Sequence, residues 1–305
     1  MNSLNKSYVL ISPVRNEEKY IQKAIDSMVN QTVQPLEYLI IDDGSTDNTA
    51  KIIQEAAKKY PWIHYEYRPD RGERKVGPGV IEAFYDGFNK LWTQDYDYIG
   101  KVDGDLSIGP QYFEKLFEQF DQDPRLGAAS GKLFLELDSG ELVAERHSDE
   151  MVVGGMQFYR RECFECIGGF VRQVMWDGIA YHRSRMEGWR TKSFHGADLI
   201  IRDHRLMGSS YKSIYHGRLR WGWGQYFMGT HPIYILAVAL YRMFERPFFL
   251  GGLLILFGYL RSWVMDSKRY DYPGFRASLH AWQLERLKLG KRLESIPKTK
   301  LQPAT

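Results

Sequence analysis

The chain has few cysteines, no secretory leader signal and no low-complexity tract. Only two of its 305 residues are cysteines, Cys163 and Cys166, so a disulfide framework is excluded and a reducing compartment is expected. A zinc site needs four ligands, and a redox C-x-x-C needs a thioredoxin-like context that is missing. We therefore expect packing cysteines. The N-terminus has no long apolar core, which indicates a cytoplasmic protein.

Long hydrophobic runs are also missing. Residues 227–241 and 247–260 carry no formal charge with histidine neutral, but a spanning helix needs about 20 apolar residues. They predict two short apolar helices joined by the charged residues 242–246. The open alternatives are an interfacial hairpin at a membrane and a hairpin packed on the rest of the chain or on a dimer partner.

Charge is unevenly distributed along the chain. Residues 261–305 hold ten Lys/Arg and four Asp/Glu, a balance of +6, whereas the whole chain carries +3. Nucleic-acid binding would require a basic patch on the folded domain itself. A basic tail behind an apolar, aromatic segment instead fits an anionic membrane surface. We expect a peripheral or monotopic protein at the inner face of the cell membrane, and no nucleic-acid partner.

Strand and helix patterns alternate through the first 120 residues. The expected strands are residues 8–12, 36–41, 63–67 and 98–102, and the expected helices are residues 17–30, 46–59, 80–91 and 110–120. Such alternation predicts an α/β fold with a doubly wound, mostly parallel, Rossmann-like sheet. Ligands of such sheets bind at the carboxyl ends of the strands.

Acidic turns follow two of these strands. Asp103-Gly104-Asp105 comes after the strand at 98–102, where two carboxylates can face one ion. Mg²⁺ and Mn²⁺ prefer oxygen ligands and bridge carboxylates to phosphate oxygens. Asp42-Asp43 follows the strand at 36–41 and could bind a base or a ribose. Each turn alone could equally be a solvated acidic loop or a helix cap.

These turns and the segment Pro13-Val14-Arg15-Asn16-Glu17 occur in an order that resembles the family 2 glycosyltransferases of the GT-A fold. The resemblance covers roughly residues 7–210. It implies a nucleotide pocket that is lined by Pro13, Arg15, Glu17, Asp42 and Asp43. It also implies a site for the metal and the diphosphate, formed by Asp103, Gly104 and Asp105.

A basic glycine-containing segment precedes the helix expected at residue 80. The resemblance places such a segment near the donor, with Arg74, Lys75 and Gly77 able to approach phosphates. An ordinary surface loop is the alternative. This stretch and residues 103–107 also resemble the polyprenyl-phosphate mannose and glucose synthases of the family.

The resemblance further implies a catalytic carboxylate and a set of residues that face the acceptor. Asp177, which follows Asp103 by 74 residues, is the general-base candidate. Trp176 replaces the first acid of the family's usual pair, and a helix cap is the alternative role for Asp177. His204 falls where several members place a histidine that contacts the metal or the diphosphate. The acceptor-side residues would be Gly168, Gly169, Phe170, Trp176, Arg220 and Trp221.

Together these features and the resemblance predict a metal-dependent hexosyltransferase of polysaccharide biosynthesis, and the resemblance implies that it inverts the anomeric carbon. Its cofactor would be Mg²⁺ or Mn²⁺, its donor a UDP- or GDP-sugar, and its acceptor a lipid-linked or membrane-proximal glycan. A polyprenyl-phosphate sugar synthase, a sugar nucleotidyltransferase and a non-catalytic membrane adaptor are the alternatives. The expected domains are 1–218 (donor half 1–106, acceptor half 107–218), an apolar helical segment at 219–265 and a basic tail at 266–305.

Overall fold

The computed structural model describes residues 6–69, 72, 77–137, 139–145, 147–205, 213–245 and 247–289. Its strands are β1 (Tyr8–Val14), β2 (Glu37–Asp42), β3 (Ile63–Tyr67), β4 (Tyr98–Val102), β5 (Leu106–Ile108), β6 (Leu126–Glu136), β7 (Leu142–Ala144), β8 (Met156–Arg160), β9 (Arg190–Phe194) and β10 (Ile200–Asp203). Its helices are α1 (Ile21–Val29), α2 (Thr49–Lys59), α3 (Pro78–Phe88), α4 (Tyr112–Gln122), α5 (Arg161–Cys166), α6 (Trp176–Met186), the 3-10 turn η2 (Ala197–Leu199), α7 (Ile214–Met228), α8 (Pro232–Arg242), α9 (Leu250–Val264) and α10 (Phe275–Leu289).

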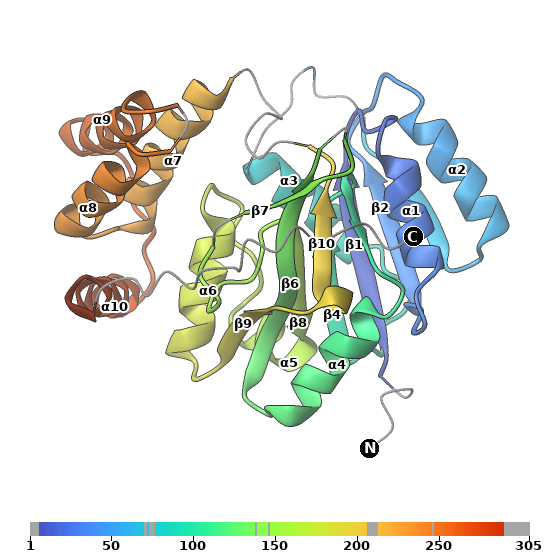
Figure 1. The fold of residues 1–305 in the computed structure, drawn as a ribbon. Coiled ribbons are helices and arrows are strands. Elements are labelled where there is room, and N and C mark those ends of the chain that lie inside the picture. Colours follow the sequence, from blue (N-terminus) through green and yellow to red (C-terminus); the bar gives the residue numbers. More distant parts are fainter. Residues whose placement is uncertain are drawn as a thin grey trace.

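One large sheet forms the centre of the molecule, in the order β3-β2-β1-β4-β8-β6-β10-β5, with β7 and β9 also paired to β6 (Figure 1). Strands β1 to β4 are mutually parallel where they pair, and β6 is parallel to β9 and β10. Strand β8 runs antiparallel to both β4 and β6. The predicted α/β fold with a mostly parallel sheet is therefore confirmed.

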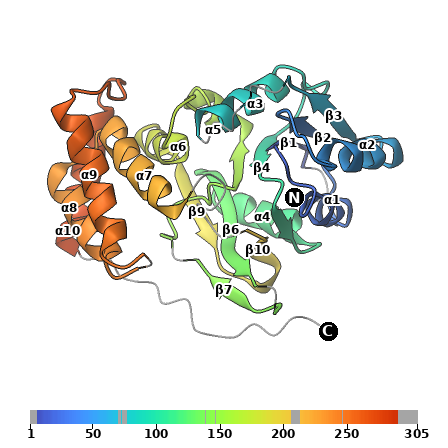
Figure 2. The ribbon, with the colours of Figure 1, turned by 90° about the horizontal axis from the view of Figure 1, so that it is seen from above.

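The sheet is covered on both faces, which is why apolar side chains of β1 are buried on both of its sides. Along β1, Tyr8 and Leu10 enter the core under α1, α2 and α4, whereas Val9 and Ile11 enter the core under α3, α5 and α6 (Figure 2). Cys163 is buried in the second core and makes no disulfide. This arrangement leaves the strand ends as the place for polar chemistry.

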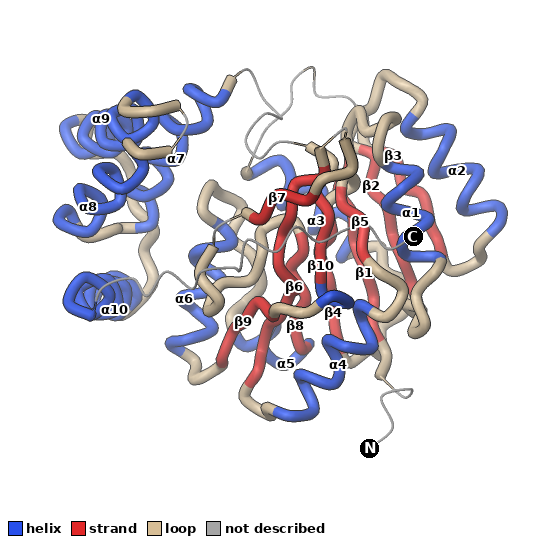
Figure 3. The backbone as a smooth tube through the Cα atoms, in the orientation of Figure 1, coloured by secondary structure: helices blue, strands red, loops and turns tan. Residues whose placement is uncertain are grey.

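Helices α7 to α10, called the helical end below, lie side by side at one end of the sheet (Figure 3). Helices α7 and α9 touch backbone to backbone, because a Cβ on Gly222 would lie 2.0 Å from the carbonyl oxygen of Ile255, and one on Gly258 would lie 2.3 Å from that of Leu219. The two expected apolar helices are present as α8 and α9. Helices α7 and α10 were not anticipated, and the boundary expected at residue 218 falls inside α7.

Part of the expected basic tail is folded. Helix α10 buries Phe275 and Leu279 against Ile179 of α6 and Phe227 of α7. Helix α10 therefore packs on both α6 and α7. Within the described ranges, no helix combines the length and the apolar character needed to cross a membrane.

Candidate active site

The first half of the site is built at the end of β4. The Asp103 N–H donates to the carbonyl oxygen of Gly155 at 2.8 Å, which ties the acidic turn to the segment that precedes β8. Lys101 is only 2 % exposed. Its Nζ forms an ion pair with Asp103 Oδ1 and donates to the carbonyl oxygen of Gly154 at 3.2 Å. Sequence reasoning missed Lys101, although a lysine inside an apolar strand was the available signal.

Two adjacent glycines separate the carboxylates of Asp103 and Asp177. A Cβ on Gly154 would lie 3.1 Å from Asp177 Oδ2, and a Cβ on Gly155 would lie 3.2 Å from Asp103 Oδ2. Side chains at these two positions would therefore press on the two acids. The fold brings together carboxylates that are 74 residues apart in the sequence, as the general-base prediction requires.

The surroundings of Asp177 affect its charge. Burial, with the nearby charge of Asp103, raises the pKa of the Asp177 carboxyl, although Lys101 and the Gly178 N–H, which donates to Oδ1 at 2.9 Å, act in the opposite direction. Met175, which lies two residues before Asp177 and directly before α6, has a left-handed backbone with φ of 60°. Such strain in a non-glycine residue is common at functional sites.

A further group of acids lies on the other side of Asp103. Burial, and then the charge of Asp103, raises the pKa of Asp105. Burial and the charge of Asp105 raise the pKa of Asp203, at the end of β10, to about 8. Asp203 was not among the predicted residues. The crowded carboxylates favour binding of a cation, and their oxygen atoms are the ligands that Mg²⁺ and Mn²⁺ prefer.

His204 is not assembled with Asp103 and Asp105 as a ligand set. Its Nδ1 lies 2.7 Å from Glu136 Oε2 and its Nε2 lies 2.8 Å from Ser107 Oγ. Across the described ranges, no group of three or more His, Cys, Asp or Glu side chains is arranged to hold a metal ion. Asp103 and Asp105 fit a cation that takes its remaining ligands from a bound phosphate, and the metal role of His204 stays a prediction.

On the donor side, the ends of β1 and β2 are tied together. Arg15 Nη1 donates to the carbonyl oxygen of Asp43 at 2.6 Å, and Arg68 Nη1 forms an ion pair with Asp43 Oδ1 at 2.7 Å. Asp42 is fully buried and accepts from the Ser45 N–H at 2.8 Å and from Tyr65 Oη at 3.2 Å. Asp42 thus holds the turn, and Pro13 pairs with Ile41 one step earlier.

Arg205 joins this donor side to the acidic turn. Its Nη2 forms an ion pair with Glu17 Oε2, and its Nε lies 3.4 Å from Asp105 Oδ2. Glu17 is 3 % exposed, and its N–H donates to Thr49 Oγ1 at 2.8 Å. Sequence reasoning assigned no role to Arg205, because nothing in the local sequence relates it to residue 17.

The predicted acceptor residues fall into two groups. Phe170 and Trp176 pack with ring centroids 4.8 Å apart, and Trp176 also lies 5.2 Å from Lys101 Nζ. Gly168 and Gly169 both have positive φ, and a Cβ on Gly169 would lie 2.3 Å from Tyr85 Oη. Trp176 therefore lies beside Lys101, and Phe170 packs against Trp176.

The second group lies further along the chain. Arg220 and Trp221 belong to α7, and Trp221 packs within the helical end, with its ring 5.7 Å from the guanidinium of Arg242.

Of the predicted phosphate-binding segment, Gly77 lies directly before α3. It has a φ of 91°, and a Cβ there would lie 3.0 Å from Val174 Cγ1. Arg74 and Lys75 lie outside the described residues.

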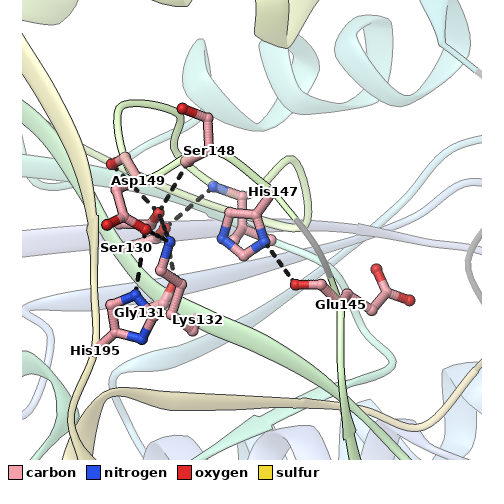
Figure 4. A network of polar contacts seen from close by, with 10 residues as sticks. Ser130, Gly131, Lys132, Glu145, His147, Ser148, Asp149 and His195 are labelled. Carbon is pink, nitrogen blue, oxygen red and sulfur yellow. Dashed lines mark hydrogen bonds and ion pairs between the residues drawn. The ribbon is translucent and has the colours of Figure 1, made fainter. Parts of the chain in front are cut away.

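A buried ion pair holds the segment that leads to Gly154 and Gly155. Lys132 on β6 pairs with Asp149 and donates to Ser193 Oγ at 2.9 Å (Figure 4). Asp149 Oδ1 also lies 3.2 Å from His195 Nε2. Further along the segment, the Val153 N–H donates to Ser130 Oγ at 3.1 Å. The two glycines are thereby fixed against the acids.

Acidic groups at the carboxyl ends of parallel strands, with a second acid opposite, lie where open α/β sheets bind their ligands. Residues 9–134 match the family model described as Glycosyl transferase family 2. Residues 9–134 thus carry a family 2 glycosyltransferase domain, within a GT-A-like fold.

Known proteins resemble the chain over different extents. The chondroitin synthase of Pasteurella multocida (strain Pm70) is 32 % identical over 114 residues, 37 % of this chain and 11 % of that protein. The chain therefore spans about a tenth of that relative's length. A mannosyltransferase structure from Pyrobaculum calidifontis matches 95 % of this chain and 83 % of its own, with TM-score 0.54 and 17 % identity. The structure of residues 1–349 of Staphylococcus aureus TarS matches 85 % of this chain and 72 % of its own, with TM-score 0.51 and 15 % identity.

The Lys132–Asp149 pair can be tested by comparison with an exposed ion pair. Lys132→Met should lower the free energy of unfolding by about 2–3 kcal/mol, somewhat less than for a fully buried pair because Asp149 reaches solvent. Lys115→Met, which breaks an exposed pair with Glu118, should change it by less than about 1 kcal/mol. Urea denaturation measures both, and equal effects would contradict a special role for the buried pair.

Proposed function

We propose that this chain moves a sugar from a nucleotide diphosphate sugar to an acceptor hydroxyl, with inversion at the anomeric carbon. The observation that carries the proposal is the pair of carboxylates, Asp103 and Asp177, on either side of the Gly154–Gly155 backbone. One acid would face the diphosphate of the donor and the other would face the acceptor. This division of roles is what a direct displacement needs.

On the donor side, the strand ends around Pro13, Arg15, Glu17, Asp42 and Asp43 would bind the nucleotide. The mannosyltransferase with a similar fold was solved with GDP-mannose and Mn²⁺, and TarS was solved with UDP-GlcNAc. These complexes support a nucleotide-sugar donor here.

Asp103 and Asp105 would hold Mg²⁺ or Mn²⁺. When bound, this ion neutralises the charge that develops on the leaving diphosphate. Lys101 orients Asp103 through their ion pair, and its own positive charge lies close to the same site. Gly104, between the two acids, leaves room for Val14, because a Cβ there would lie 2.7 Å from Val14 Cγ1.

On the acceptor side, Asp177 would accept the proton of the attacking hydroxyl. Its raised pKa makes it a stronger base than an ordinary aspartate. Trp176 would border the acceptor pocket beside Lys101, and the buried ring of Phe170 would support Trp176 from behind. A phosphate acceptor would need no base, because its oxygen is already ionised, so Asp177 favours a hydroxyl over a polyprenyl phosphate.

We further infer that the acceptor is presented at a membrane surface. Helices α8 and α9 and their flanks expose large apolar side chains, each more than 40 % accessible: Ile233, Leu236, Leu240, Phe244, Phe248, Phe249, Leu250, Leu253, Phe257, Leu260, Trp263, Val264 and Met265. This set is called the apolar face below.

A lipid surface is the occupant that suits the apolar face best. Soluble monomers rarely expose large apolar patches, whereas the exposed apolar side chains here are concentrated on two neighbouring helices and their flanks. Helix α9 has 15 residues, or about 22 Å at 1.5 Å per residue, which suits an interfacial helix. The exposed cations Arg261, Lys268 and Arg276 follow the face and match anionic headgroups.

The donor site is tested with Asp105→Ala. Wild-type protein should bind one class among UDP-, GDP-, dTDP- and CMP-sugars in the presence of Mn²⁺ or Mg²⁺, and EDTA should abolish that binding. The variant should bind at least on the order of 10–100-fold more weakly, since a metal ligand is lost. Calorimetry measures both proteins. Absence of binding to every nucleotide sugar would favour a non-catalytic adaptor.

The role of Asp177 is tested with Asp177→Asn. Transfer to a hydroxyl acceptor should fall by about 10²–10⁴-fold, because the base is lost, while donor binding stays. In the wild type, the rate should fall as the pH drops through the Asp177 pKa, which lies above the ordinary value of about 4. Undiminished transfer to a polyprenyl phosphate by the variant would instead identify a polyprenyl-phosphate sugar synthase.

The apolar face is tested with the double variant Leu253→Ser/Phe257→Ser. Binding to phosphatidylglycerol vesicles, measured by sedimentation, should weaken at least about tenfold, because each buried side chain contributes about 1.5–3 kcal/mol. Trp92→Ser removes an exposed ring of the catalytic domain, 73 % accessible, and should change nothing. If the wild type is a dimer that does not bind vesicles and the double variant is a monomer, the apolar face is a dimer interface instead.

A further inference from the structure

Arg205 lies between two carboxylates that belong to different parts of the donor site. Its guanidinium pairs with Glu17, which follows β1, and with Asp105, which precedes β5. The side chain of Glu17 is 4 % exposed and that of Asp105 is 18 % exposed. The positive charge of Arg205 therefore compensates two largely buried negative charges in the protein without a donor.

The backbone around Arg205 leaves it little choice of direction. The N–H of His204 donates to the carbonyl oxygen of Asp105 at 3.1 Å, and the N–H of Arg205 donates to Asp203 Oδ1 at 2.8 Å. The Arg205 guanidinium also lies 5.4 Å from the ring centroid of Tyr20. These contacts hold it against the acidic turn and not in solvent.

This position conflicts with a second cation. A divalent ion at Asp103 and Asp105 would lie beside the guanidinium and would compete with it for the oxygens of Asp105. Two positive groups at one carboxylate repel each other, so binding of the ion and the Arg205–Asp105 contact are mutually unfavourable. By linkage, removal of one must strengthen the other.

We propose that Arg205 is the internal counter-cation of the donor site: its guanidinium balances Glu17 and Asp105 while the site is empty and releases Asp105 when a divalent cation binds. The proposal rests on the metal site of the proposed function. It assigns Arg205 a positioning role that keeps the acidic turn ordered between turnovers. It also lowers the affinity for metal alone, so that metal binds best together with the donor diphosphate.

The test is a titration of the protein with Mn²⁺ in the absence of nucleotide. Electron paramagnetic resonance of the free ion measures how much Mn²⁺ is bound. Arg205→Met should bind Mn²⁺ at least about fivefold more tightly than the wild type, the lower end of typical coupling between sites. Arg205→Lys keeps the charge and should stay close to the wild type. Arg202→Met removes an exposed arginine from β10, the strand that ends two residues before Arg205, and should change nothing. Asp105→Ala should lose the site.

The outcomes separate the two proposals. If Asp105→Ala abolishes Mn²⁺ binding and Arg205→Met binds no more tightly than the wild type, Arg205 is not the counter-cation and the metal site stands. If Asp105→Ala binds Mn²⁺ like the wild type, the metal site itself is wrong and this proposal falls with it. Should Arg205→Met fail to fold, Glu17→Gln/Arg205→Met removes both partners, and Glu17→Gln alone is then its reference.

Discussion

Negative charge confined at the end of the sheet is the constraint around which this structure is organised. Burial, and then the charge of Asp103, raises the pKa of Asp105, and burial with the charges of Asp105 and Asp103 raises the pKa of Asp203. Without nearby positive charges, such a group of carboxylates would take up protons and become neutral. Lys101 and Arg205 compensate part of the negative charge from within the fold, and a bound cation would compensate the rest.

The backbone decides how closely the two principal acids can approach. Gly154 and Gly155 leave no side chain between Asp103 and Asp177, and the segment before them is held by the buried Lys132 ion pair and by the Ser130 hydroxyl. The site thus depends on residues that contact no substrate. Its geometry is a property of β6, β9 and the connecting segment as much as of the acids.

The helical end is joined to the chemistry through α6. Asp177 stands in the first turn of this helix, and Ile179 packs against α7 and α10. A Cβ on Gly224 of α7 would lie 2.7 Å from Met175 Cγ, directly before α6. The helices that expose the apolar face are therefore in contact with the helix that carries the proposed base.

The sequence by itself determined the alternation of strands and helices, the acidic turns after β2 and β4, and the two short apolar helices, because these depend on local periodicity and turn chemistry. Tertiary structure alone decided that Arg205 meets Glu17, that His204 pairs with Glu136 and Ser107, and that α10 covers α6. Those contacts join residues far apart in the chain. No periodicity encodes them, since they arise only when the sheet and its helices pack into one body.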